Sequence, residues 1–375
     1  MASRRLRLLS ALLLVLVLYQ LWFSLYWLET TTHRVGVAVG SSQVPLNEVP
    51  IEFAQPANAI TGISPASLHN PLCTRDELRL GQWVPTILPD GPPYVSKTTH
   101  LRCHPKAYYQ QRPFPWFDWQ PASNCTFVPW SAPHFCQVLQ NATVSIIGDS
   151  LSWEMYSSLL QLLGQRVHQT DQHRSRDEQR NHVQSACHTT FVWRNDAYLQ
   201  YVNDSIRDDV PDVLILNRGA HYVNDTTLTD DLRRVMEIVD EWKRGCRARE
   251  RPHCRVFWRT TVPGTPGCNQ TSGTFPNLTA VDYSRPNNDK VFMEHLVEDR
   301  SSYTDKSWKF GWYHFARQNR LVEELLGDRV EYLDAYDLNI LRPDGHRVHQ
   351  NDCLHNCYPG KMDVYNQLLL HALLR

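Results

Sequence analysis

Buried strand patterns alternate with helical patterns from residue 142 to residue 374, and this alternation limits the possible folds more than any other feature. The run ATVSIIGDS at 142–150 predicts a buried strand, and WEMYSSLLQLLG at 153–164 predicts a helix ending at Gly164. Further strands are predicted at 210–222, 254–264 and 330–338, and further helices at 228–245, 312–327 and 362–374. The pattern is typical of an α/β protein whose mainly parallel sheet carries helices on both faces.

Three residues mark the ends of predicted strands. Ligands of such sheets bind beyond the carboxyl ends of the strands. Ser150, Asn217 and Pro263 fall at those ends, so the topology alone gathers them at one edge of the sheet.

The N-terminus carries a membrane signal. Arg4, Arg5 and Arg7 precede an uncharged apolar stretch at 8–28, which is long enough for the ~20 residues that span a bilayer. We expect a signal-anchor helix with residues 1–7 in the cytoplasm and the remainder in a lumen. A cleavable signal peptide is the alternative, although its apolar region would be shorter and no clear cleavage site follows.

The remaining chain divides into two parts. Residues 29–70 mix Thr, Ser, Pro, Gly and Ala without helical period and predict a luminal stem, whereas residues 71–375 predict one folded luminal domain. A net charge of -1 with mixed charges argues against nucleic acid as a partner. Trp83, Trp116 and Trp119 are read as core residues, with a sugar-binding platform as the alternative.

Cysteines and glycosylation sequons agree with a luminal location. The 10 cysteines fit an oxidising compartment and up to five disulfides. Sequons, which are acceptors in the secretory pathway, occur at Asn124, Asn141, Asn203, Asn224, Asn269 and Asn277. We therefore expect a single-pass type II protein of the Golgi membrane, with no prediction of its oligomeric state.

Ser150 lies where a strand turns into a helix, in the sequence Gly-Asp-Ser. A serine nucleophile needs a base, a carboxylate that orients the base, and donors for the oxyanion. The N–H groups at the start of the following helix favour developing negative charge there. A structural turn is the alternative, because Asp and Ser are ordinary turn and cap residues.

Asp352 and His355 are the candidate partners of Ser150. Their spacing of three lets both side chains face one way, so the carboxylate can orient the imidazole. His221 and His346 are competing bases.

The cysteines around His355 also admit a metal reading. Cys353, His355 and Cys357 could bind zinc, but a lumen favours disulfides and no second ligand pair has zinc-like spacing. No metal site is predicted.

Several motifs occur in a fixed order along the chain. CTRDELRLGQWV and WFDWQPASNCTFVPW come first, IIGDSLSWEMYSSLL, LILNRGAHY and VFWRTTVPGTPGC follow, and LRPDGHRVHQNDCLHNCYPGKMDVYNQLLL ends the series. With this set the chain resembles the trichome-birefringence-like, or PC-esterase, family of polysaccharide O-acetyltransferases, which is related to GDSL/SGNH hydrolases. The resemblance runs from Cys73 almost to the C-terminus and implies an SGNH-like three-layer α/β/α fold.

The resemblance also implies roles for particular residues. It makes Ser150 the nucleophile and completes the triad with His355 and Asp352. Asn217, with Gly219 beside it, corresponds to an oxyanion asparagine.

Other positions of the pattern are assigned less directly. The resemblance places Arg259 at a substrate contact and makes His346 structural. Two positions depart from the family pattern: Asn356 and Tyr365 each replace a tryptophan, which affects the acceptor contacts more than the triad.

A disulfide plan follows from the same resemblance. It pairs Cys353 with Cys268, Cys357 with Cys103, and Cys73 with Cys125. Cys246 and Cys254 are close enough in sequence to pair locally, which leaves Cys136 with Cys187.

The function implied is O-acetyl transfer through a Ser150 acyl-enzyme to a hydroxyl of a polysaccharide or glycan. An acetylesterase with the same triad is the main alternative, and a non-catalytic glycan-binding protein is a third. No bound cofactor is expected. The acetyl group comes from a co-substrate, for which acetyl-CoA is one candidate.

Overall fold

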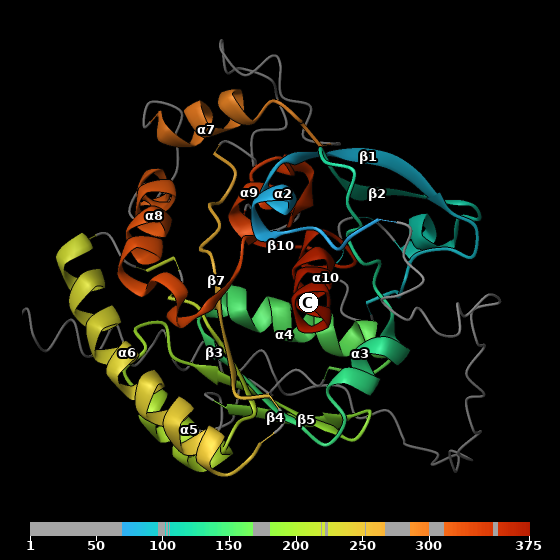
Figure 1. Cartoon of the computed structure of the whole chain (residues 1–375). Helices are drawn as coiled ribbons and strands as arrows, with labels where there is room; N and C mark the ends of the chain where they lie inside the picture. Colours follow the sequence, from blue (N-terminus) through green and yellow to red (C-terminus); the bar gives the residue numbers. More distant parts are fainter. Residues whose placement is uncertain are drawn as a thin grey trace, which may run out of the picture. The chain divides into compact units, whose positions relative to one another are not determined.

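Six strands form the central sheet of the protein in the computed structural model shown in Figure 1. Their spatial order is β4 (Asn181–Ala186), β5 (Thr189–Asn195), β3 (Thr143–Gly148), β6 (Val213–Leu216), β7 (Arg255–Arg259) and β8 (Glu331–Leu333). Neighbouring strands from β5 to β8 are parallel, and β4 is antiparallel to β5. The predicted α/β fold with a mainly parallel central sheet is confirmed.

The structure describes one unit of the chain. The unit spans residues 60–375, and the described residues are 70–96, 102, 104, 106–167, 181–218, 220–221, 224–251, 253–266, 286–299, 311–347 and 352–375. The expected tail, membrane helix and most of the stem lie outside these residues. Within them, no helix is both long and apolar enough to cross a bilayer.

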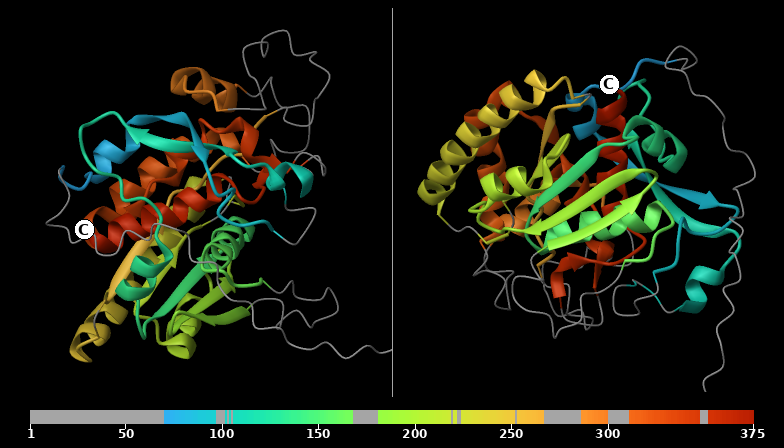
Figure 2. Two further views of the ribbon diagram at one scale, coloured as in Figure 1. Left: turned by 90° about the vertical axis from the view of Figure 1, so that its right-hand side faces the viewer. Right: turned by 90° about the horizontal axis from the view of Figure 1, so that it is seen from below.

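Helices cover both faces of the sheet. Residues of β3 such as Val144 and Ile146 pack on one face with α3 (Ala132–Val138), α4 (Ser150–Leu162) and α10 (Lys361–Leu374). Ile147 points to the other face, which packs with α5 (Val202–Asp209), α6 (Asp225–Ala248) and α8 (Phe315–Leu326). The alternating β3 pattern therefore feeds two hydrophobic cores, and α4 and α10 lie side by side in one layer (Figure 2).

The strand order identifies one edge position of the sheet as the preferred ligand site. Numbered along the chain, the parallel strands β3, β5, β6, β7 and β8 have the spatial order 2-1-3-4-5. In this order the chain reverses direction across the sheet between β3 and β6, and ligands bind at such a switch point. Ser150 and Asn217 follow these two strands.

Several elements were not predicted from the sequence. They include the β4–β5 pair and an antiparallel hairpin of β1 (Gly81–Leu88) with β2 (Phe114–Pro121). The predicted strand at 330–338 is shorter than expected, because β8 ends at Leu333 and α9 (Ala335–Asn339) follows. Within the described residues, the remaining short elements are α2 (Arg75–Arg79), α7 (Lys290–Glu298), β9 (His346–Arg347) and β10 (Asp352–Asn356), together with 3-10 turns at Lys106–Gln110, Trp312–His314, Gly327–Arg329 and Pro343–Gly345.

Trp83 and Trp119 anchor the β1–β2 hairpin in the core. Their side chains are 3% and 6% exposed, and the two rings meet edge to face at 5.5 Å between centroids. Trp83 Nε1 donates to the carbonyl of Leu338, and Trp119 Nε1 donates to that of Leu78. Both indoles therefore act as core residues, as the sequence favoured.

The disulfides agree with the expected plan where both partners are described. Cys73 pairs with Cys125, and the other two observed bonds are Cys136–Cys187 and Cys246–Cys254. Cys353 and Cys357 are also disulfide-bonded, while their expected partners, Cys268 and Cys103, lie outside the described residues. The described sequon asparagines are all exposed: Asn124, Asn141, Asn203 and Asn224; Asn269 and Asn277 lie outside the described part.

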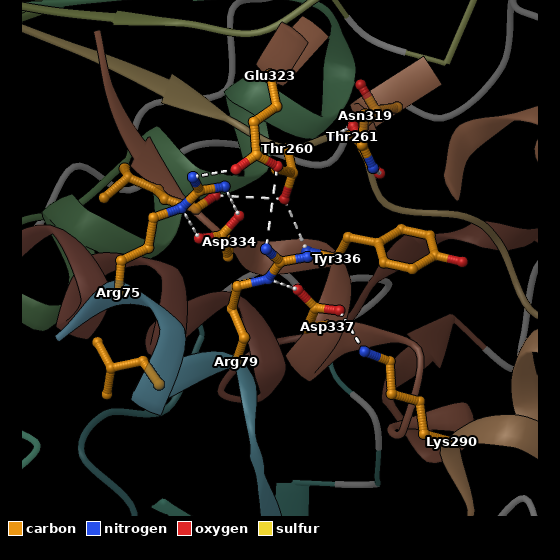
Figure 3. A network of polar contacts seen from close by, with 12 residues as sticks. Arg75, Arg79, Thr260, Thr261, Lys290, Asn319, Glu323, Asp334, Tyr336 and Asp337 are labelled. Atoms are coloured by element: carbon orange, nitrogen blue, oxygen red, sulfur yellow. Dashed lines mark hydrogen bonds and ion pairs between the residues drawn. The ribbon is translucent and has the colours of Figure 1, made fainter. Parts of the chain in front are cut away.

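An ion-pair network joins α2 to the carboxyl end of the sheet (Figure 3). Arg75 binds Asp334 through two hydrogen bonds of 2.6 and 2.9 Å and reaches Glu323 at 2.5 Å. Arg79 and Lys290 share the carboxylate of Asp337 at 2.8 and 2.6 Å. Burial raises the pKa of Asp334, while its hydrogen bond to Arg75 opposes that rise.

We expect R75A to lower the free energy of unfolding by about 3 kcal/mol, because it leaves the buried carboxylate of Asp334 without its bidentate partner. Chemical denaturation measures this change. R207A is the matched control, since Arg207 pairs with the exposed Asp204 and its loss should leave the stability close to that of the parent. Equal losses for the two variants would contradict the network's role.

Candidate active site

Ser150 is the first residue of α4, directly beyond the central strand β3. Gly148 makes the tight turn feasible because a Cβ there would lie 2.3 Å from Ser152 Oγ and 2.7 Å from the carbonyl oxygen of Asn217. Asp149 caps the helix, and its Oδ1 accepts from Leu151 N at 3.0 Å. The half-buried Ser150 begins a helix whose first N–H groups lack intrahelical acceptors.

Ser150 and His355 meet across the fold. The distance from His355 Nε2 to Ser150 Oγ is 2.7 Å, although the residues are 205 positions apart. Both side chains are half-buried, so the pair is neither sealed in the core nor freely solvated. This is the geometry that a base and its nucleophile require.

The other predicted members of the triad and their competitors occupy different settings. Asp352 is the first residue of β10, and its side chain lies outside the described part of the structure. His346 is 2% exposed, and its Nδ1 lies 2.5 Å from the carbonyl oxygen of Pro343, which suits a structural role. His221 lies near the site, with Nε2 3.7 Å from Asp149 Oδ2.

Asn217 is buried beneath the nucleophile turn and is tied to β7. Its Nδ2 donates to the carbonyl of Arg259 at 2.8 Å and to Thr261 Oγ1 at 3.2 Å. Its Oδ1 accepts from Arg259 at 2.7 Å. Both amide hydrogens therefore have acceptors here, and the oxyanion role stays a prediction that requires this amide to exchange partners. Gly219, the other expected donor, lies outside the described residues.

Arg259 occupies the interior of the protein and has no exposed surface. Besides Asn217, its guanidinium donates to Ser152 Oγ at 3.2 Å. Burial lowers the pKa of Arg259, and the nearby charges of Asp149 and Glu154 oppose that shift. Its position does not support the expected direct contact with substrate, because other side chains cover it. It supports the nucleophile helix from below instead.

The Asp149 carboxylate joins two loops at the switch point. Its Oδ2 accepts from Ala220 N at 2.8 Å, while its Oδ1 caps α4. The loop after β6 is thereby fixed to the start of α4, which brings the two predicted oxyanion segments together. The sequence identified Asp149 only as part of the Gly-Asp-Ser turn.

The alternative that Cys353, His355 and Cys357 bind zinc does not fit the state of the two cysteines. Both are disulfide-bonded, so neither offers a thiolate to a metal. Within the described ranges, no group of three or more His, Cys, Asp and Glu side chains is arranged to hold a metal ion.

A polar pocket lies beyond β7 and β8, with a cavity volume of about 150 Å³. It is lined by Thr260, Tyr336 and the charged side chains of the α2 network, which are largely paired with one another (Figure 3). Neither Ser150 nor His355 lines it. We therefore treat the Ser150–His355 pair as the candidate active site and this pocket as part of the ion-pair network.

Residues 193–372 match the PC-esterase family, a GDSL/SGNH-like acyl-esterase family found in Pmr5 and Cas1p. This segment of the chain is similar to PC-esterase domains. The match includes His355 and begins after Ser150, which the structure places in contact with it. The predicted resemblance to this family is confirmed.

Several known proteins resemble this chain over most of their own length. Xyloglucan O-acetyltransferase 4 from Populus trichocarpa is 23% identical and covers 79% of this chain and 80% of its own. Proteins trichome birefringence-like 25 and 26 from Arabidopsis thaliana are 21% and 22% identical and cover 80% and 83% of this chain. The similarity therefore extends well beyond the residues of the family match.

Asp363 joins three segments of the fold near α4. Its Oδ1 accepts from Ser158 Oγ and Tyr94 Oη, both at 2.6 Å, and its Oδ2 accepts from Gly360 N at 2.9 Å. Burial raises the pKa of Asp363 from 3.8 to about 6, and these hydrogen bonds oppose the rise. One carboxyl thus links α4, α10 and the N-terminal segment.

The raised pKa predicts a pH-dependent stability. The folded protein holds a proton on Asp363 that the unfolded chain has released, so this stabilisation is complete below about pH 4 and is lost as the pH rises through 6. We expect the stability difference between the parent and D363N to change by about 2–3 kcal/mol between pH 4 and 7. Denaturation at each pH measures it, and a constant difference would contradict the prediction.

Proposed function

We propose that this protein is an O-acetyltransferase that acetylates hydroxyl groups of a polysaccharide or glycan through an acyl-enzyme on Ser150. The observation that carries the proposal is the 2.7 Å contact between His355 Nε2 and Ser150 Oγ at the switch point of the sheet. The names of the relatives, which include xyloglucan O-acetyltransferases, support the choice of reaction and of a glycan acceptor.

The first half-reaction loads the enzyme. Ser150 Oγ attacks the acetyl carbonyl of the donor, and its proton passes to His355 Nε2. The backbone N–H of Ser150 at the start of α4 offers hydrogen bonding to the oxyanion, and Asn217 and Gly219 are the further predicted donors. The tetrahedral intermediate collapses, and the leaving group takes the proton from His355.

The second half-reaction transfers the acetyl group. A glycan hydroxyl gives its proton to His355 and attacks the acyl carbon, and Ser150 Oγ leaves and recovers the proton. Asp352 is assigned the orientation of the imidazole on sequence grounds. The acetyl donor is a co-substrate such as acetyl-CoA, and no resident cofactor takes part in this scheme.

The location proposed for this reaction rests on sequence. The apolar stretch at 8–28, the sequons and the paired cysteines favour a Golgi membrane protein of type II with the PC-esterase domain in the lumen. Accessible acceptors there are the glycans of the secretory pathway.

The second candidate is a glycan acetylesterase, in which water replaces the sugar hydroxyl. The description of the matching family as acyl-esterases favours keeping it. The same Ser150–His355 pair serves both reactions, because only the second nucleophile differs.

We expect S150A and H355A to lose donor hydrolysis and acetyl transfer by at least about 10³-fold, because each removes half of the nucleophile–base pair. The assay incubates the luminal domain with an acetyl donor, with and without xyloglucan, xylan, pectin and mannan, and follows acceptor mass. Release of free acetate from pre-acetylated glycan, without any gain of acceptor mass, would favour the esterase.

H221A discriminates between the two histidines near Ser150. If H221A abolished turnover and H355A retained it, the assigned base would be wrong. Full activity of S150A would remove the acyl-enzyme altogether and leave a glycan-binding role.

A further inference from the structure

We propose that Glu154 and Asn356 are positioning residues that hold His355 in register with Ser150. The inference rests on the proposed serine acyl transfer and adds residues to it. Asn356 occupies a position where the resembling family usually has tryptophan, and the structure supplies a partner for it on α4.

The Ser150–His355 pair and the Glu154–Asn356 pair form successive contacts between α4 and β10. Glu154 follows Ser150 by one helical turn, so both side chains lie on the same face of α4. Asn356 directly follows His355. The Asn356 N–H donates to both carboxylate oxygens of Glu154, at 2.9 and 3.0 Å, and its Nδ2 donates to Oε2 at 2.6 Å.

The strand that carries His355 is held by β9 and by the disulfide-bonded cysteines Cys353 and Cys357 on either side of the histidine. It pairs with β9 at Asp352–Arg347 and Asn356–His346, with an irregularity between the two pairs. The irregular pairing with β9 does not by itself fix the register of the residues between the two pairs. The carboxylate of Glu154 accepts hydrogen bonds from the backbone N–H of Asn356, one residue beyond His355. This contact fixes the position of the His355 imidazole relative to Ser150 along the axis of α4.

Burial makes the loss of the Glu154–Asn356 hydrogen bonds costly. Glu154 is 0% exposed and Asn356 is 1% exposed. A desolvated carboxylate is stable only with its hydrogen bonds made, so a shift of the His355 segment that broke them would be unfavourable. Tyr358 Oη adds a bond to the carbonyl of Glu154 at 3.2 Å. These bonds restrict His355 to the small displacement that proton transfer from Ser150 tolerates.

The chain offers a matched control for this contact. Asn366 also donates its side-chain amide to α4, at 3.0 Å to Ser158 Oγ and 3.2 Å to the carbonyl of Met155. It is equally buried but lies on α10, away from the His355 segment. N356A removes the side-chain bond from Asn356 to Glu154 and keeps the two backbone bonds. N366A removes side-chain bonds from α10 to α4, so only the first variant removes a bond of the His355 segment.

The test measures the rate at which a fluorophosphonate labels Ser150, together with kcat and KM for acetyl transfer and the melting temperature. We expect N356A to slow labelling and kcat about 10-fold with KM unchanged, since the substrate contacts remain. N366A should lower the melting temperature by a similar amount and leave the labelling rate within about twofold of the parent.

A polarity swap gives a second, independent readout. N356D alone opposes two buried carboxylates and should slow labelling more than N356A, by about 100-fold. The double variant E154Q/N356D lets the amide at 154 donate to the carboxylate at 356 and should recover at least about 10-fold of that loss. If N356D does not fold, N356A against N366A decides.

The outcomes separate the two proposals. Labelling of parent Ser150, with N356A and N366A slowed equally or with no recovery in the double variant, overturns the positioning role and leaves the acyl-enzyme intact. If parent Ser150 is not labelled and S150A retains activity, the serine mechanism fails and the positioning role fails with it.

Discussion

The burial of α4 is the constraint on which the candidate site depends. The helix lies between the central sheet and α10, so the polar side chains of Ser152, Glu154, Ser157 and Ser158 are buried. A buried polar group needs a hydrogen-bond partner, and those partners come from distant parts of the chain. The observed pairs are Ser152 with Arg259, Glu154 with Asn356, and Ser158 with Asp363 and Asn366. The C-terminal segment is therefore bound to the helix that begins at Ser150.

The same burial gives the site its electrostatic character. Arg259 is a desolvated cation whose pKa is lowered by burial and supported by the charges of Asp149 and Glu154. These charges lie beneath the nucleophile helix rather than at the surface, so they can hold the turn and its N–H groups in place without contacting substrate. A preorganised setting of this kind is what stabilises a developing oxyanion. The half-buried Ser150–His355 contact therefore lies at the solvent-facing end of a buried polar network.

The N-terminal β1–β2 hairpin and the ion-pair network of α2 pack against the segment that follows β8. Trp83 and Trp119 bury their rings against the C-terminal half, and Arg75 clamps Asp334 beyond β8. Segments from both ends of the described chain are therefore needed around one sheet, although the residues of the family match begin only at position 193. This explains why the proposed nucleophile and base belong to one fold while lying in separate parts of the sequence.

The sequence alone determined the strand–turn–helix at Ser150, the mainly parallel sheet, the pairing plan of the described cysteines and the choice of His355. Each depends on local periodicity, turn chemistry or an ordered set of motifs. It did not predict β5 beside β3, the β1–β2 hairpin, the burial of Arg259 or the Glu154–Asn356 contact. Those depend on which distant segments pack together. From the sequence pattern, Glu154 on an amphipathic helix would be expected at the surface. Only the tertiary structure buries its carboxylate against Asn356, 202 positions away.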